Sequence, residues 1–177
     1  MRLKGKIALI TGAAQGLGAA IAKRFSEEGA SVVICDLNAE VGASTVTEIE
    51  GKGGVAAFVR LDVAKEQDWA DAMAAVVAKF GRLDVLVNNA GINIREPIEE
   101  MAAANFDMML SINVKGPFLG IKHAIPLMRQ SGGGSIINMS SICGLVGHKY
   151  TTEAYTVTKG AVTLLTKTVG VRYAKDN

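Results

Sequence analysis

Residues 7–18 read Ile7-Ala-Leu-Ile-Thr-Gly-Ala-Ala-Gln-Gly-Leu-Gly18 and join a short apolar run to a glycine-rich turn. The uncharged run Ile7–Thr11 predicts a buried strand. Apolar residues then recur at Ile21, Ala22 and Phe25 with charged residues between them, which predicts a helix. A strand that leads through such a turn into a helix is the opening unit of a doubly wound α/β fold.

The same alternation continues along the whole sequence. Further strands are expected at 31–36, 55–61, 84–88 and 135–139, and helices at 38–50, 65–80, after Pro97 as far as the glycines 132–134, and at 155–173. Continuous apolar strands separated by helices predict parallel pairing with right-handed crossovers. The chain of 177 residues suits one domain. We therefore expect an α/β, Rossmann-like, doubly wound parallel sheet, with residues 1–177 forming a single dinucleotide-binding and catalytic domain.

The composition excludes several classes of protein. The net charge is +2 and no basic run stands out, so neither nucleic acid nor an acidic membrane is an expected partner. The longest uncharged stretch, Ile7 to Ala22, has 16 residues and is too short and too polar to span a bilayer. Cys35 and Cys143 match no metal spacing. Without a secretory signal, they indicate free thiols in the cytoplasm and no metal site.

The glycine turn has the spacing of a site for a dinucleotide. Gly12 permits a tight turn, Gly16 lets the backbone approach a pyrophosphate, and Gly18 lets the helix pack on the strand. Free N–H groups at the start of the helix then face the phosphates. The alternative is a chance spacing in a chain with 20 glycines. A Walker-type phosphate loop is excluded because no Gly-Lys-Ser/Thr follows.

An acidic residue follows the second expected strand. Asp36 lies near the spacing at which a carboxylate accepts hydrogen bonds from the adenosine ribose and repels a 2′-phosphate. No Lys or Arg occurs in the glycine turn or immediately after Asp36 to offset that repulsion. NAD is therefore favoured over NADP. The alternative is a solvated aspartate that caps the next helix.

Tyr155 and Lys159 share one face of the last expected helix, because they are four residues apart. A phenol ionises at a pKa of about 10, and a nearby ammonium lowers that pKa toward the useful range. Tyr155 could then take the proton of an alcohol or return it to a ketone. Ser141 follows the fifth strand, where its hydroxyl could hydrogen-bond the reacting oxygen.

These motifs together resemble the short-chain dehydrogenase/reductase family: Thr11-Gly12-x-x-x-Gly16-x-Gly18, Asn88-Asn89-Ala90-Gly91, Asn113, Ser141 and Tyr155-x-x-x-Lys159. Their order and relative spacing also resemble the family, from Lys4 onward. The resemblance implies that Lys159 binds the nicotinamide ribose and that Asn113 holds a water linking Lys159 to solvent.

The resemblance also assigns the remaining cofactor contacts. The expected cofactor-binding residues are Gly12, Gln15, Gly16, Leu17, Gly18, Asp36, Leu37, Asp62, Val63, Asn89, Ala90, Gly91, Tyr155 and Lys159. Asp62 and Val63 should flank the adenine. Asn88 is expected to brace neighbouring strands rather than to touch the cofactor.

Two features differ from the family pattern. Ser141 precedes Tyr155 by 14 positions, about one more than is usual in the family, so Ser140 remains an alternative for the active serine. His148 lies in this segment, which should border the substrate. Family members also continue beyond the point corresponding to Asn177 with further strands and a lid. We therefore expect a polypeptide ending at Asn177 to be truncated, poorly soluble and nearly inactive.

The expected function is an NAD-dependent oxidoreductase that interconverts a secondary alcohol and a ketone. Tyr155 is the expected acid/base, assisted by Lys159, Ser141 and Asn113. One alternative is a 3-oxoacyl thioester reductase of the same family, which would prefer NADPH. Others are a nucleotide-binding scaffold with little activity and a methyltransferase on a similar sheet, which would need no Tyr-x-x-x-Lys pair.

The protein is expected to form a homodimer or homotetramer through helices 102–129 and 155–173. These helices carry more apolar residues than one side of a sheet can cover: Met108, Met109, Leu119, Ile121, Val162, Leu164, Leu165 and Val169.

Overall fold

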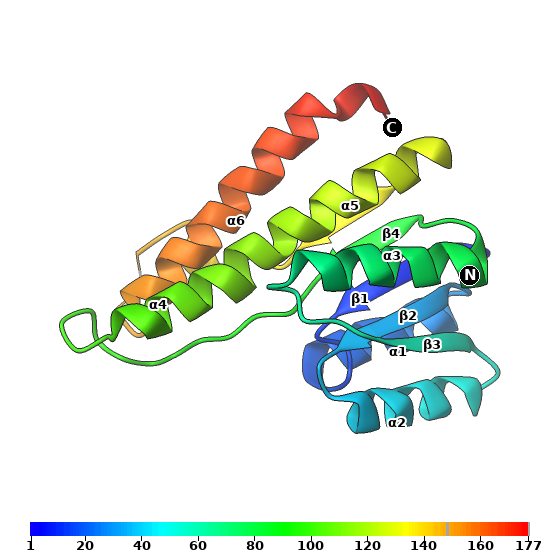
Figure 1. Ribbon diagram of the computed structural model, residues 1–177, viewed down its shortest axis with the longest axis horizontal. Coiled ribbons are helices and arrows are strands. Elements are labelled where there is room, and N and C mark those ends of the chain that lie inside the picture. Colours follow the sequence, from blue (N-terminus) through cyan, green and yellow to red (C-terminus); the bar gives the residue numbers. More distant parts are fainter. Residues whose placement is uncertain (148, 177) are drawn as a thin grey trace.

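The fold is a parallel sheet of five strands. The computed structural model describes residues 1–147 and 149–176 and is drawn as a ribbon in Figure 1. The strands are β1 (Ile7–Thr11), β2 (Ser31–Asp36), β3 (Val55–Arg60), β4 (Val85–Asn88) and β5 (Ser135–Asn138). Their order is β3-β2-β1-β4-β5, and each adjacent pair is parallel. The expected Rossmann-like α/β fold is confirmed. His148 and Asn177, named above, lie outside the described residues.

Helices connect the strands as the sequence pattern predicts. They are α1 (Gly16–Glu27), α2 (Ala39–Glu50), α3 (Glu66–Phe80), α4 (Ala103–Leu110), α5 (Gly116–Gln130) and α6 (Glu153–Arg172), with short 3₁₀ turns η2 (Ile142–Gly144) and η3 (Ala174–Asp176). Of the helices that the structure describes, none combines the length and the apolar character needed to cross a membrane.

The long helical region after Pro97 differs from the expected single helix. Its first turn begins only at Ala103, and a π-helical turn, η1 (Ser111–Lys115), separates α4 from α5. A π turn carries i→i+5 hydrogen bonds and is frequent at functional sites. The spacing of apolar residues along the sequence does not reveal that one helical turn contains an extra residue. This π turn contains Asn113.

The sheet separates two hydrophobic cores, as a doubly wound fold requires. Alternate residues of β1 point to opposite faces: Leu9 packs with Trp69 of α3, whereas Ile10 packs with Ala22 of α1. Trp69 is fully buried, and its Nε1 donates a hydrogen bond to the Val63 carbonyl at 3.0 Å. All four side chains are fully buried. The cores hold the strands in register and bring their carboxyl ends to one edge.

The apolar surface expected on the last two helical regions is smaller than predicted. Four of the eight residues named for it are buried within the chain: Met109, Leu119, Ile121 and Val162. Met108 and Leu164 remain exposed. The exposed apolar surface of these helices is therefore narrower than expected, and the exposed side chains of Phe118, Val157 and Val171 also belong to it.

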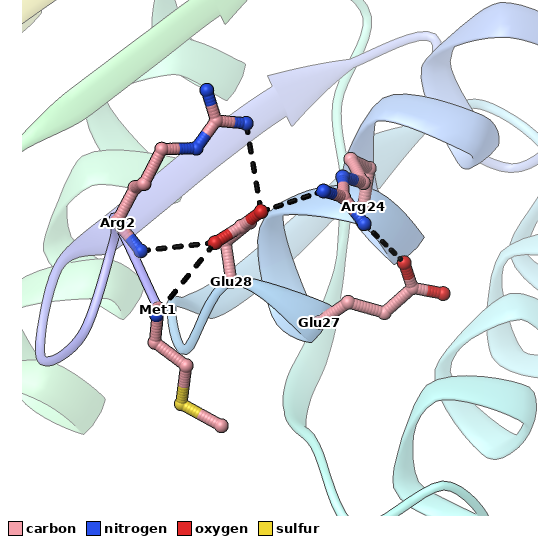
Figure 2. A network of polar contacts seen from close by, with 5 residues as sticks. All are labelled: Met1, Arg2, Arg24, Glu27 and Glu28. Atoms are coloured by element: carbon pink, nitrogen blue, oxygen red, sulfur yellow. Dashed lines mark hydrogen bonds and ion pairs between the residues drawn. The ribbon is translucent and has the colours of Figure 1, made fainter.

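The N-terminus is attached to the end of α1 by a network of charges (Figure 2). The Glu28 carboxylate accepts a hydrogen bond from the Arg2 backbone N–H at 2.9 Å and from the Arg24 guanidinium at 2.6 Å. The amino group of Met1 lies 4.0 Å from the same carboxylate. The Arg2 hydrogen bond contributes most, with the Arg2 and Arg24 charges, to holding the pKa of Glu28 below its ordinary value.

We expect Glu28→Gln to lower the melting temperature at about pH 7 and to have a smaller effect at about pH 3. Because the pKa of Glu28 is lower in the folded state, its stabilisation is present above the ordinary carboxyl value of 4.5 and is lost as the pH falls through the lowered value. Thermal unfolding measured across this pH range tests the expectation. Glu27→Gln, at an exposed carboxylate paired with Arg24, is the control. If Glu28→Gln lowered the melting temperature equally at both pH values, this expectation would be contradicted.

Candidate functional site

A cleft of about 380 Å³ lies at the carboxyl edge of the sheet. It sits where the strand order reverses, since β1 pairs with β2 on one side and with β4 on the other. In open α/β sheets ligands bind at this switch point. Nine of the expected cofactor-binding residues line the cleft: Gly12, Gln15, Asp36, Leu37, Asp62, Val63, Asn89, Ala90 and Gly91. Leu61, Ile92 and Ile112 also line it and were not predicted.

The glycine turn needs its glycines for two different reasons. Gly12 and Gly16 have φ angles of +63° and +59°, a region that residues with a Cβ rarely adopt. A Cβ on Gly12 would also lie 2.9 Å from the Cα of Ala90. At Gly18 the requirement is space, because a Cβ would lie 2.2 Å from the Gly12 carbonyl oxygen. The turn therefore passes close to the segment after β4 and opens directly into α1.

Asp36 is held at the end of β2 by backbone donors. Its Oδ2 accepts a hydrogen bond from Ala14 N at 3.1 Å, and its Oδ1 accepts one from Asn38 N at 3.1 Å. The cap of α2 is Asn38, whose side chain accepts from Val41 N. The capping role considered for Asp36 therefore belongs to Asn38. Among the described residues that line the cleft there is no Lys or Arg.

The segment after β4 is braced against both neighbouring strands. Asn88 donates from Nδ2 to the Asn138 Oδ1 at 2.8 Å, so it links β4 to β5 as expected. Asn89 lines the cleft, but its Nδ2 donates to the carbonyls of Thr11 and Gly12 at 2.9 and 3.1 Å. The side-chain nitrogen of Asn89 thus supports the glycine turn. The sequence reasoning assigned Asn89 only a contact with the cofactor.

Thr11 has a supporting function that the sequence reasoning missed. Its Oγ1 accepts hydrogen bonds from the backbone N–H groups of Asn89 and Ala90, both at 3.0 Å. It also lies 3.4 Å from the Val87 carbonyl, to which it donates. A hydroxyl at the last position of a buried strand was the available signal. Which backbone groups it would meet depended on the pairing of β1 with β4.

Three of the four residues expected to act in catalysis, Asn113, Tyr155 and Lys159, lie close together beside the cleft. Asn113 and Lys159 both lie beside Gly91, where an added Cβ would be 3.2 Å from Asn113 Oδ1 and 3.7 Å from Lys159 Nζ. Asn113 is clamped to Ile92, donating from Nδ2 to its carbonyl and accepting its N–H at Oδ1, both at 2.8 Å. The Lys159 Nζ lies 5.5 Å from the centre of the Tyr155 ring.

Lys159 is buried, with 6% of its surface exposed. Its Nζ donates to the Met139 carbonyl at the end of β5, at 2.6 Å. Burial lowers the pKa of the Lys159 ammonium below its ordinary value. A desolvated ammonium acts more strongly on its neighbours than one in water, because the surrounding dielectric is lower.

The two candidate serines have different partners. The Ser140 hydroxyl lies 2.6 Å from the Thr163 hydroxyl and donates to the Lys159 carbonyl at 3.1 Å, so it attaches β5 to α6. The Ser141 Oγ accepts a hydrogen bond from Cys143 N at 3.2 Å, as the cap of η2. Acceptance from a backbone N–H leaves the proton of Ser141 available for another acceptor. This arrangement favours Ser141 over Ser140 as a donor to a bound oxygen.

Known proteins resemble this chain along nearly its full length. The family model described as short chain dehydrogenase matches residues 6–177. A 2,5-dichloro-2,5-cyclohexadiene-1,4-diol dehydrogenase of Sphingobium indicum is 48% identical over 172 residues, which are 97% of this chain and 68% of that protein. A cyclopentanol dehydrogenase of Comamonas sp. is 42% identical over 176 residues, covering 99% of this chain and 70% of that protein.

A solved structure agrees with these similarities. The crystal structure of a protein assigned as a short-chain dehydrogenase/reductase from Burkholderia xenovorans superposes with a TM-score of 0.95 at 34% identity, covering 99% of this chain and 72% of that one. The family consists of oxidoreductases that act on CH–OH groups with NAD(H) or NADP(H). Because the family model matches residues 6–177 and the solved structure has the same fold, the chain belongs to the short chain dehydrogenase family.

Proposed function

We propose that the protein is an oxidoreductase that uses NAD(H) to interconvert a secondary alcohol and a ketone. The observation that carries this proposal is the buried Lys159 ammonium beside the Tyr155 ring, next to a cleft with a glycine turn and an acidic residue. The pair of Tyr155 and Lys159 suits proton transfer, and the cleft suits a dinucleotide. The two relatives named above are dehydrogenases of a cyclic diol and of cyclopentanol, so cyclopentanol and cyclohexanol are suitable first substrates.

The residues of the cleft fit NAD. The glycine turn and the N-terminus of α1 would hold the pyrophosphate, because backbone N–H groups at a helix start favour anions. Asp36 would accept hydrogen bonds from the adenosine ribose, and Asp62 and Val63 would flank the adenine. The backbone at Asn89, Ala90 and Gly91, together with Gly16, Leu17 and Leu37, would complete the contacts. Bound NAD would accept the hydride from the alcohol carbon.

The side chains beyond the cleft would move the proton. Tyr155 would take the hydroxyl proton of the alcohol, and the adjacent Lys159 ammonium would stabilise the phenolate that forms. Ser141 would donate a hydrogen bond to the reacting oxygen. Lys159 and Tyr155 would also contact the nicotinamide ribose, and Asn113 would support a water that links Lys159 to solvent.

Other properties of the protein are proposed on the same basis. Residues 1–177 would form the dinucleotide-binding and catalytic domain of the full-length protein, since a single sheet carries both cores and the cleft. A cytoplasmic location is supported by the free thiols of Cys35 and Cys143. A homo-oligomer, a dimer or tetramer, would bury the exposed apolar residues of α4, α5 and α6.

We expect the protein to bind NAD more tightly than NADP, by about ten- to a hundred-fold, because a 2′-phosphate would meet the Asp36 carboxylate in a cleft whose described lining contains no Lys or Arg. Calorimetric titration of both cofactors measures the preference. Asp36→Ala should reduce it, whereas Asp71→Ala, on the outer surface of α3, should not. Equal or tighter binding of NADP would refute the proposed cofactor.

In the full-length protein, Tyr155→Phe should lower turnover by about a hundred- to ten-thousand-fold, because the oxygen that carries the proton is lost while the ring stays. The affinity for NAD should change little. Steady-state rates with cyclic secondary alcohols and a binding titration provide the two measurements. Tyr173→Phe, just beyond α6, is the matched control. Turnover above about a tenth of normal in Tyr155→Phe would assign proton transfer to another residue.

The proposed oligomer should depend on the exposed apolar residues of the last helices. We expect Leu164→Arg to reduce the molar mass measured by light scattering at micromolar concentration, because a charge would be buried in the interface. Val55→Arg, at an exposed apolar residue of β3, should leave the mass unchanged. A monomeric unsubstituted protein would exclude this assembly.

A further inference from the structure

Thr158 is a fully buried polar residue in the first half of α6, between Tyr155 and Lys159 in sequence. Its Oγ1 donates a hydrogen bond to the Tyr155 carbonyl at 2.8 Å. The same oxygen accepts a hydrogen bond from Asn113 Nδ2 at 3.1 Å. The hydroxyl therefore has both a donor and an acceptor partner, as burial requires.

The bond to Asn113 extends into a chain of hydrogen bonds. Asn113 also donates from Nδ2 to the Ile92 carbonyl and accepts the Ile92 N–H at Oδ1. Both hydrogens of its amide and its oxygen are thus committed. The chain Ile92–Asn113–Thr158–Tyr155 connects the segment after β4, the π turn η1 and α6. These are three elements that meet beside the cleft.

We propose that Thr158 is a positioning residue for proton transfer: its hydroxyl fixes the first turns of α6, with Tyr155 and Lys159, relative to Asn113 and the cleft. The inference rests on the proposed function. Tyr155 itself reaches the reacting oxygen, so its backbone must stay in place to within a fraction of an ångström. A displacement of about 1 Å can cost a hundredfold in rate. Among the described contacts, Thr158 supplies the side-chain link between α6 and the amide of Asn113.

A merely structural role is the competing explanation, since buried threonines in helices often return a hydrogen bond to a preceding carbonyl. The same helix contains a control threonine with the same types of hydrogen-bond partner, although Thr166 is exposed and Thr158 is buried. Thr166 Oγ1 donates to the Val162 carbonyl at 2.7 Å and accepts from Asn138 Nδ2 at 2.9 Å. Thr166 thus makes the same pair of bonds about two turns further along α6, away from Tyr155.

The test compares Thr158→Ala with Thr158→Ser, which differ only in the hydroxyl, and Thr166→Ala with Thr166→Ser. For each protein we measure kcat and KM for cyclopentanol, the Kd for NADH by fluorescence, and the melting temperature. Thr158→Ala should lower kcat by at least about tenfold with KM and Kd changed less than about threefold. Thr158→Ser should recover more than about half of kcat. Both Thr166 variants should retain kcat, whatever their melting temperatures. If Thr158→Ala does not fold, Thr158→Val, which keeps the side-chain volume, takes its place.

The possible failures are distinguishable. If the unsubstituted protein is active and Thr158→Ala and Thr158→Ser have equal kcat, the positioning role of Thr158 alone is overturned. An equal loss of kcat in Thr158→Ala and Thr166→Ala would also overturn it, because the effect would then follow helix stability. Parent protein that binds NADH but turns over none of the secondary alcohols would overturn the proposed reaction, and the role of Thr158 with it.

Discussion

The simultaneous pairing of β1 with β2 and with β4 is the constraint on which the site depends. Parallel pairing on both sides of one strand brings the segments after β1, β2 and β4 to one edge, although they are far apart in sequence. The turn after β1 can then approach the segment after β4 only if Gly12 has no side chain. The cleft between them is a consequence of strand order, and its shape is maintained by the two cores on either face of the sheet.

Backbone groups, rather than ion pairs, hold the cleft in shape. Asn89 donates two hydrogen bonds to Thr11 across the β1–β4 pair, and Asp36 is fixed by two backbone N–H groups. Such bonds lie in buried or half-buried positions, where solvent screens them little. Many of the described ion pairs lie instead at exposed surfaces, such as Arg24–Glu27 and Lys122–Glu66, where each contributes little to stability.

The second half of the site depends on α6 and on what attaches it to the sheet. Ser140 connects the end of β5 to the Lys159 carbonyl, and Lys159 itself reaches back to Met139. Gly144 lies so close to α6 that a Cβ would be 2.6 Å from the Lys159 carbonyl oxygen. The Lys159 ammonium is buried beside the end of β5. Its desolvation is offset by a short hydrogen bond to a carbonyl.

The sequence by itself determined the fold class and most elements of the cleft. Strand and helix alternate in the local hydrophobic pattern, and the glycines and Asp36 are tied to turns adjacent to their strands, so local information was sufficient for them. It did not determine the π turn at Asn113, the amide of Asn89 directed into the glycine turn, the burial of Met109 and Val162, or the bond from Thr158 to Asn113. Each of these features depends on which distant segment of the chain lies opposite the residue, and only the tertiary structure decided that. The hydrophobic period along the chain determines whether a residue lies in a strand or a helix. Its hydrogen-bond partner is determined by how distant elements pack across the sheet.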